Sequence, residues 1–258
     1  MKKLPIKELK AFLDEKAALY ETPTFLDTDP IQVPAQFSLK EDAEIAGFLT
    51  ATIAWGNRKS ILTNAHRLME IMGHSPYDFV MNYTPEKHSS LFDGFVHRTF
   101  NNIDLGYFIE GLQHLYTQHG TMENYFNQFS NFPRINDAIT NFKHDFFSLP
   151  HPKRTTKHIS DPSKNSAAKR INMFFRWMVR PNTNGVDLGL WTKINTNQLS
   201  CPLDVHSGNV ARKLGILLRK QNDAKALLEL DTALRKMDAN DPVKYDYALF
   251  GLGVFEKF

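Results

Sequence analysis

Two side chains with catalytic potential stand at the starts of two predicted helices. Lys169 follows the turn sequence PSKNS and opens the stretch KRINMFFRWMV. Asp204 ends an apolar run and directly precedes the amphipathic stretch VHSGNVARKLGIL, thirty-five residues further along the chain. A lysine amine is a nucleophile once it loses its proton, and a carboxylate held at a helix start beside a cleft can act on a substrate. The two residues together indicate covalent chemistry by an amine.

Each of these residues also has a structural interpretation. Asp204 suits the N-cap of the helix that follows it, because an aspartate there accepts hydrogen bonds from free backbone N–H groups, typically for about 1 kcal/mol. Lys169 is harder to explain by structure alone. The helix dipole opposes positive charge in a first turn, which favours loss of the proton that a free lysine keeps at neutral pH.

Positive charge is concentrated around Lys169. Residues 153–180 contain eight lysines and arginines and a single acid, Asp161, so this segment carries +7 while the whole chain carries +3. The rest of the chain is therefore net acidic, at −4. A local positive field of this size suits a polyanion, because each neutralised phosphate releases counterions. The structural alternative is a solvated loop and helix face.

The elements that position these residues are predicted to be helices. Apolar residues recur at helical spacing, a capping box at Ser38 and Glu41 opens one helix, and Asp241 followed by proline opens the last one. We expect an all-α, two-lobed fold, with a first lobe over residues 1–147 and a second over residues 148–258. The N-terminal helix is allowed to pack on the second lobe. The helical stretches are SLKEDAEIAGFLTATIAW, GNRKSILTNAHRLMEIMG, DLGYFIEGLQHLYTQHG, RINDAITNFKHDFFSL, AKRINMFFRWMV and NDAKALLELDTALRKM.

Composition narrows the class of protein. The single cysteine, Cys201, excludes an internal disulfide, an iron–sulfur cluster and any zinc site that needs several thiolates of this chain. The N-terminal sequence MKKLPIKELKAFLDEK does not resemble a signal peptide, and no apolar run approaches the roughly 18 residues that a membrane span needs. We therefore expect a cytoplasmic protein with no cofactor, no metal site and no membrane partner.

Two motifs resemble those of a known superfamily. NSAAKRINMFFR and LDVHSGNVARKLG are similar to the functional motifs of the helix-hairpin-helix DNA glycosylases, most closely the compact 8-oxoguanine DNA glycosylase/AP lyases. In that family a hairpin ends in a lysine, Phe, an apolar residue and Arg follow five to seven positions later, and an Asp-x-His sequence opens the next helix. The longer stretch SKNSAAKRINMFFRWMVRPNTNGVDLGLW also resembles an uncharacterised family of Bacteroides-type bacteria. The matching positions are Lys169, Phe174, Phe175, Arg176, Asp204 and His206.

This sequence departs from the glycosylase pattern at two places. Ser163 and Asn165 stand near the positions where these enzymes have the two hairpin glycines that hold a DNA phosphate. The interval between Lys169 and Asp204 is longer than in most relatives. We interpret the additional segment, RPNTNGVDLGLWTKINTNQLSC, as an inserted surface loop, which costs little closure entropy.

The resemblance implies base-excision repair by a monomer on double-stranded DNA with a damaged, flipped-out base. Lys169 would attack the sugar C1′ and form a Schiff base, and Asp204 would stabilise positive charge on the sugar and help to deprotonate the amine. Base-pocket roles fall on Phe174, Trp177 and His206, although the two aromatic residues suit a core and His206 suits a structural hydrogen bond. DNA-contacting roles fall on Lys153, Arg154, Lys157, Ser163, Lys164, Asn165, Ser166, Arg170, Arg176, Asn57 and Arg58, of which Asn57 and Arg58 would fill the gap left by the flipped base unless they only connect two helices.

Two functions of other classes stay open. A non-catalytic DNA-binding module would keep the basic surface, but its lysine and carboxylate would not meet across a pocket. A metal-dependent phosphohydrolase is suggested by His144 and Asp145, although no further ligands stand at suitable spacing.

Overall fold

A computed structural model describes residues 5–258, and the prediction of an all-α protein is confirmed. The strands β1 (Val96–His97) and β2 (Phe100–Asn101) form a single short antiparallel pair. Short 3-10 turns connect many of the helices. Within the described residues the α-helices are α1 (Ile6–Tyr20), α2 (Lys40–Ile53), α3 (Arg58–Ile71), α4 (Pro76–Met81), α5 (Pro85–His88), α6 (Asn102–His119), α7 (Met122–Asn127), α8 (Ile139–Phe146), α9 (Lys169–Val179), α10 (Val205–Lys213), α11 (Ala224–Met237) and α12 (Tyr245–Val254). No helix of residues 5–258 has both the length and the apolar character that crossing a membrane requires.

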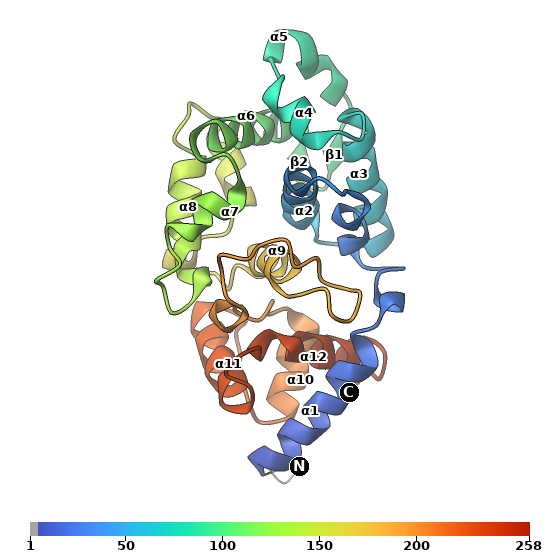
Figure 1. Cartoon of the computed structure of the whole chain (residues 1–258), viewed down its shortest axis with the longest axis vertical. Coiled ribbons are helices and arrows are strands. Elements are labelled where there is room, and N and C mark those ends of the chain that lie inside the picture. The colour runs from blue at the N-terminus through green and yellow to red at the C-terminus, as the bar shows by residue number, and fades with distance from the viewer. Residues whose placement is uncertain (1–4) are drawn as a thin grey trace.

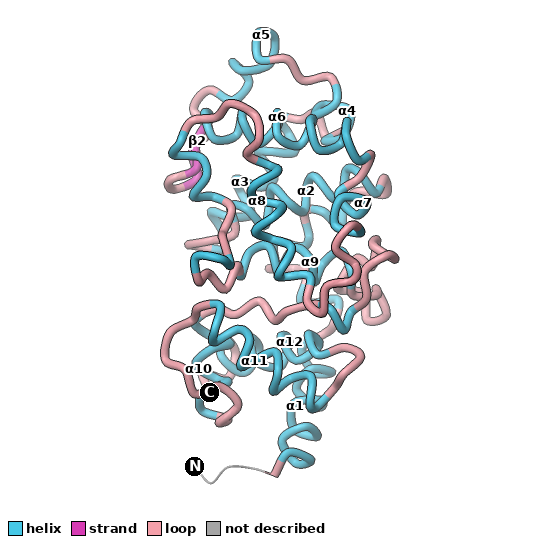
Figure 2. The backbone as a smooth tube through the Cα atoms, turned by 90° about the vertical axis from the view of Figure 1, so that its left-hand side faces the viewer, coloured by secondary structure: helices cyan, strands magenta, loops and turns pink. Residues whose placement is uncertain are grey.

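The helices gather on two sides of α9. Figures 1 and 2 show α2 to α8 above α9, and α1, α10, α11 and α12 below it. The first helix of the chain therefore lies among the last ones, and it packs along α12. The exact boundary between two lobes stays a prediction, because one continuous apolar core runs from Leu9 in α1 through α9 to Leu252 in α12.

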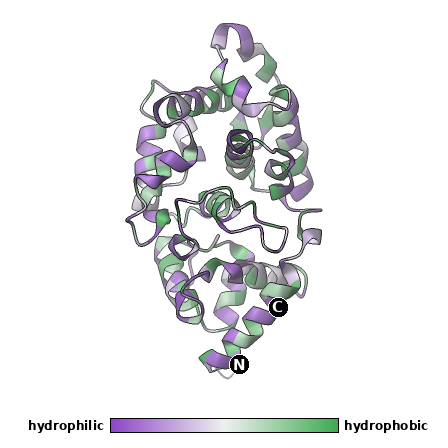
Figure 3. Ribbon diagram, in the orientation of Figure 1, coloured by the Kyte–Doolittle hydropathy of each residue, from purple (hydrophilic) through white to green (hydrophobic). Residues whose placement is uncertain are grey.

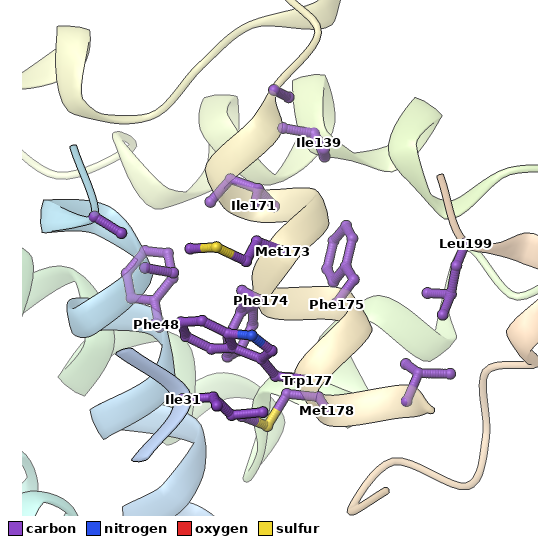
Figure 4. Close-up of a cluster of buried hydrophobic side chains, with 14 of the residues drawn as sticks. Ile31, Phe48, Ile139, Ile171, Met173, Phe174, Phe175, Trp177, Met178 and Leu199 are labelled. Atoms are coloured by element: carbon purple, nitrogen blue, oxygen red, sulfur yellow. The ribbon is translucent and has the colours of Figure 1, made fainter. Parts of the chain in front are cut away.

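Helix α9 is the centre of this core. Its sequence places apolar side chains on all sides from Ile171 to Val179, so a helix here is stable only when it is surrounded by other elements. Figure 3 shows its hydrophobic residues at the middle of the molecule, and Figure 4 shows them packed against Phe48 of α2. Helix α2 approaches closely at Gly47, where a Cβ atom would lie 2.6 Å from the Cε atom of Met178.

Two predicted helix starts differ in detail. Helix α2 begins at Lys40 after Leu39, without a side-chain cap, so the predicted capping box of Ser38 and Glu41 is wrong. The last helix begins at Tyr245 after a 3-10 turn. Asp241 does not cap it, because its carboxylate accepts hydrogen bonds from the buried guanidinium of Arg180 instead. A tertiary ion pair has replaced the local hydrogen bond that the sequence suggested.

The segment that joins α9 to α10 is not the predicted surface loop. Trp191 is 2% exposed, and its indole N–H donates to Oε1 of Glu44 in α2 at 2.7 Å. The backbone N–H groups of Leu188 and Trp191 donate to carbonyls at the end of α9, each at 2.8 Å. The segment follows α9 back across the core, and its aromatic side chain fills space between α2 and α9. The insertion is therefore a structural part of the fold.

Candidate active site

A cavity of about 950 Å³ lies between the N-terminal end of α9, the start of α10, the end of α12 and the turn between α2 and α3. Lys169 and Asp204 both line it, although they are thirty-five residues apart in the chain. The volume falls within the roughly 300–1,000 Å³ of typical small-molecule sites. The lining residues are Phe25, Asp29, Pro30, Ala54, Trp55, Gly56, Arg58, Ile61, Lys169, Arg170, Met173, Arg176, Pro202, Asp204, Val205, His206, Asp246, Phe250, Gly253, Val254 and Lys257.

Lys169 is the first residue of α9 and stands after a strained turn. Ala168 has a φ of +46°, a left-handed conformation that is costly for a residue with a Cβ atom, and its N–H donates to Oγ of Ser166 at 3.2 Å. The hydrogen-bond partner of the Lys169 amine is Sδ of Met173 at 3.5 Å, and a thioether is a weak acceptor. Among the described residues no carboxylate forms an ion pair with this amine. The amine therefore lines the cavity without an ion-pair partner among the described residues.

Asp204 is the N-cap of α10, as predicted. Its Oδ1 accepts hydrogen bonds from the N–H and Oγ of Ser207 at 2.9 and 3.1 Å, and Ser207 Oγ accepts in return from the Asp204 N–H. Only Oδ1 takes part in hydrogen bonds within residues 5–258. Because capping occupies one carboxylate oxygen, the other remains available to the cavity that Asp204 lines. The two interpretations of this residue are compatible.

Asp246 of α12 is a further ionisable group at the cavity, and our sequence analysis did not identify it. It is 6% exposed, accepts a hydrogen bond from Nη1 of Arg176 and lies 3.7 Å from Sγ of Cys201. Burial raises the pKa of Asp246 to about 6. The positive charges of Arg176 and Lys169 oppose this rise, while the negative charge of Asp204 adds to it. Asp246 therefore lies within the fields of both predicted catalytic residues. An acid in the apolar run YDYALFGLG was the available signal.

Two other predicted residues, Arg58 and His206, line the cavity. Arg58 donates to Oγ1 of Thr28 at 3.1 Å and lies over the ring of Phe250, 5.4 Å from its centroid. His206 comes from α10, and its ring centroid lies 6.3 Å from that of the same phenylalanine. Asn57 does not line the cavity. It caps α3, with Oδ1 accepting from the N–H of Ser60 at 3.2 Å, as the helix-connection interpretation expects.

Phe174 and Trp177 lie in the core and not at the cavity. Both side chains are 0% exposed, and Figure 4 shows them packed beside Phe48 and Ile31. Lys169, Met173 and Arg176 share the helix face that meets the cavity, because they recur at a spacing of three or four. The two aromatic residues follow on the neighbouring surface of α9, where they fill the core.

Two acidic side chains of the protein accept hydrogen bonds from the hairpin that precedes α9. Oδ1 of Asp161 accepts from the N–H and the Oγ of Ser163, at 3.1 and 2.6 Å. Asn165 has a φ of +66° and donates from its side chain to Asp223 at 3.0 Å. None of Lys153, Arg154, Lys157, Ser163, Lys164, Asn165 and Ser166 lines the cavity.

The basic segment is also partly neutralised. Arg154 pairs with Asp104 at 3.1 Å, and Arg176 and Arg180 pair with acids that lie outside residues 153–180. Lys153, Lys157 and Lys164 are exposed. Acids from other parts of the chain therefore offset part of the +7 charge of residues 153–180 in the folded protein.

No cluster of three or more histidine, cysteine, aspartate or glutamate side chains with metal-binding geometry occurs in residues 5–258. His144 is exposed and pairs with Asp145 at 3.0 Å, and Asp145 also accepts from the hydroxyl of Tyr125 at 2.7 Å. The pair that suggested a phosphohydrolase thus has a local hydrogen-bonding role.

Residues 29–255 match the model of a protein family described as Protein of unknown function (DUF2400). No curated protein and no solved structure matches the chain. Because the match covers most of the sequence, including every residue of the cavity lining except Phe25 and Lys257, the chain belongs to this family.

Proposed function

We propose that the protein is a DNA glycosylase/AP lyase that removes damaged bases through a Schiff base on Lys169. The observation that carries this proposal is that Lys169 and Asp204 line the same cavity. Within residues 5–258 the amine has no ion-pair partner and one oxygen of the carboxylate accepts no hydrogen bond, and an available amine and carboxylate are the groups that such a reaction needs. The proposal includes a two-lobed helical fold of the helix-hairpin-helix glycosylase type, double-stranded DNA as substrate and oxidised bases as the first lesion class to test.

The chemistry follows from the two groups. A nucleotide flipped into the cavity would present C1′ to the Lys169 amine, which forms a C–N bond while the glycosidic bond breaks and the base leaves with its electron pair. Asp204 would stabilise the positive charge that develops on the sugar and accept the proton that the attacking amine loses. The C1′–O4′ bond then breaks with its electron pair going to O4′, which takes the proton held by Asp204, while the nitrogen lone pair forms the C=N bond of the protonated Schiff base. Asp246 would make the cavity more negative whenever it is ionised.

Borohydride trapping tests this function. The protein is mixed with duplexes carrying 8-oxoguanine, uracil or an abasic site, and the reductant converts any Schiff base to a permanent protein–DNA adduct. We expect an adduct with at least one duplex, and its complete loss in Lys169→Gln. Lys225→Gln is a matched control, because Lys225 also stands in the first turn of a helix but is exposed and lies away from this cavity.

The same experiment separates an enzyme from a binding module. Duplex binding by Lys169→Gln should remain close to that of the unmodified protein, because only one cation is lost. If the unmodified protein binds all three duplexes and forms no adduct with any of them, the glycosylase/lyase assignment fails, and a non-catalytic DNA-binding role takes its place.

A further inference from the structure

Arg170, the residue after Lys169, is a cation with no anionic partner within residues 5–258. Its guanidinium donates to the carbonyl oxygen of Thr52 and, at 3.0 Å, to that of His158. Its Cζ atom lies 4.6 Å from the ring centroid of Trp55. Arg170 and Trp55 are both partly buried, and both line the cavity. Among the residues that the structure describes, no carboxylate forms an ion pair with Arg170.

Two other arginines, Arg176 within α9 and Arg180 at its C-cap, have ion-pair partners that Arg170 lacks. Arg176 pairs with Asp187 and Asp246, and Arg180 pairs with Glu21, Asp187 and Asp241. A cation removed from water is costly unless an anion or several hydrogen bonds compensate it. Burial accordingly lowers the pKa of Arg170 to about 10. Two of its five N–H groups bind backbone carbonyls, which leaves three without a partner in residues 5–258.

We propose that Arg170, held over the ring of Trp55, is an anion subsite of the cavity that binds a phosphodiester group of the nucleic-acid strand. The guanidinium fork matches a phosphate in geometry and charge, and its contacts with Thr52, His158 and Trp55 fix it before the ligand arrives. The subsite lies next to Lys169 in the chain, so it serves atoms close to the reacting sugar.

The inference deepens the proposed glycosylase/lyase function and rests on it for the identity of the phosphate. After Schiff-base formation, C2′ loses a proton to a base, a C2′=C3′ double bond forms, and the C3′–O bond breaks with its electron pair leaving on the 3′ phosphate. The phosphate thereby changes from a diester with one negative charge to a monoester that gains a second. A fixed cation stabilises this developing charge and accelerates strand cleavage without affecting release of the base.

Phosphate binding can be measured without any catalysis. Trp177 and Trp191 are almost completely buried, so Trp55 is the tryptophan whose fluorescence should respond to a ligand in the cavity. Inorganic phosphate and the dinucleotide TpT are titrated separately at constant ionic strength, with acetate as a carboxylate probe. We expect saturable changes with phosphate and TpT that disappear in Arg170→Gln and in Trp55→Phe.

Arg67→Gln is the matched control for this titration. Arg67 also donates to a backbone carbonyl, that of Gly94 at 3.2 Å, and also lies over an aromatic ring, 5.7 Å from the centroid of Phe95, but it does not line the cavity. An equal response to acetate, or a response that survives in Arg170→Gln, overturns the subsite. A response to inorganic phosphate but not to TpT overturns its assignment to a nucleic-acid strand.

The kinetic test divides the reaction into two steps. On an abasic duplex, Arg170→Gln should form the borohydride adduct at nearly the unmodified rate, while strand cleavage slows by about 100-fold or more. Arg170→Lys, which keeps the charge but loses the fork, should recover part of the cleavage rate. Equal cleavage rates in all three proteins overturn the inference. If the unmodified protein forms no adduct, the proposed function fails, and the titration alone decides whether Arg170 binds phosphate.

Discussion

The first and last turns of α9 carry the same kinds of basic side chain in opposite surroundings. At the first turn, Lys169 and Arg170 face a cavity and have no ion-pair partner among the described residues. At the other end, Arg176 in the last turn and Arg180 at the C-cap are 3% and 4% exposed, and they pair with four acids, which are Glu21, Asp187, Asp241 and Asp246. The difference shows that the presence of a paired acid, more than the number of positive charges, distinguishes cations that stabilise the fold from cations that are available to bind a ligand.

The largest stability effect is expected at the compensated end. Arg180→Gln leaves Glu21, Asp187 and Asp241 without their shared cation, which should lower the free energy of unfolding by about 3–5 kcal/mol. Arg170→Gln loses two hydrogen bonds to carbonyls and should cost about 1–2 kcal/mol. Urea unfolding of both variants measures the contrast. Equal losses would show that the two ends do not differ in the way described.

Asp204→Asn should have the opposite profile. Asparagine is as good an N-cap as aspartate, so the free energy of unfolding should change little. Loss of the negative charge at the cavity should slow base release by about 100- to 1,000-fold. Denaturation and single-turnover kinetics of the same preparation test both expectations. A variant that unfolds easily, yet keeps full activity in its folded fraction, would make Asp204 only a cap.

Asp246 lines the cavity and also pairs with Arg176 near the other end of α9. Its titration should contribute to the pH dependence of the free energy of unfolding. Its pKa is about 6 in the folded protein, above the ordinary value near 3.8, so between these pH values the folded state binds more protons than the unfolded state. Stability therefore falls as pH rises through this window, by an amount on the order of 1–3 kcal/mol from this group. The groups around it are Arg176, Lys169, Asp204 and Cys201.

Asp246→Asn isolates this contribution. The variant loses the pair with Arg176, so it should be less stable overall, but its stability should fall less between pH 4 and pH 6 than that of the unmodified protein. Thermal unfolding across this range gives the two slopes. Parallel curves would place the pKa of Asp246 outside the window.

The smallest effect is expected on the surface of the basic segment. Lys153 and Lys157 are exposed, so replacing both with glutamine should reduce the salt dependence of duplex binding by about two counterions if they contact phosphates. Arg154 is already paired with Asp104, and Arg154→Gln should change the salt dependence less than either lysine. Binding that does not respond to salt in any of these proteins would argue against DNA at this surface.

Local sequence patterns predicted the helices well, and they also predicted the N-cap of α10 at Asp204. Helical spacing is set by neighbours three and four residues apart, so α9 could be read directly from its own residues. Asp204 as a cap depends only on Ser207, three residues later. The joint presence of Lys169 and Asp204 at one cavity was expected through the family resemblance, because no local pattern relates two residues thirty-five positions apart.

Features that depend on distant partners were not predictable. Asp241 has the sequence context of a cap, but Arg180, which binds it, lies 61 residues away. Trp191 lies in a segment without periodicity, and its partner Glu44 is 147 residues distant. Phe174 has the spacing of a core residue and of a stacking residue alike, and only the approach of α2 at Gly47 decides between them. The residues around Asp246 in the sequence do not indicate its partner Arg176, which lies 70 residues away.

The packing of α1 along α12 has a consequence for the order of events during synthesis. Leu9, Leu13 and Ala17 form the buried face of α1, and Asp14 accepts a hydrogen bond from Tyr245, 231 residues later. At a translation rate of about 5–20 residues per second, this face emerges from the ribosome roughly 10–50 s before its partner exists. Helix α1 therefore exposes an apolar stripe until α12 has been synthesised, which makes it a target for a chaperone and makes the helices below α9 in Figure 1 the last part to assemble.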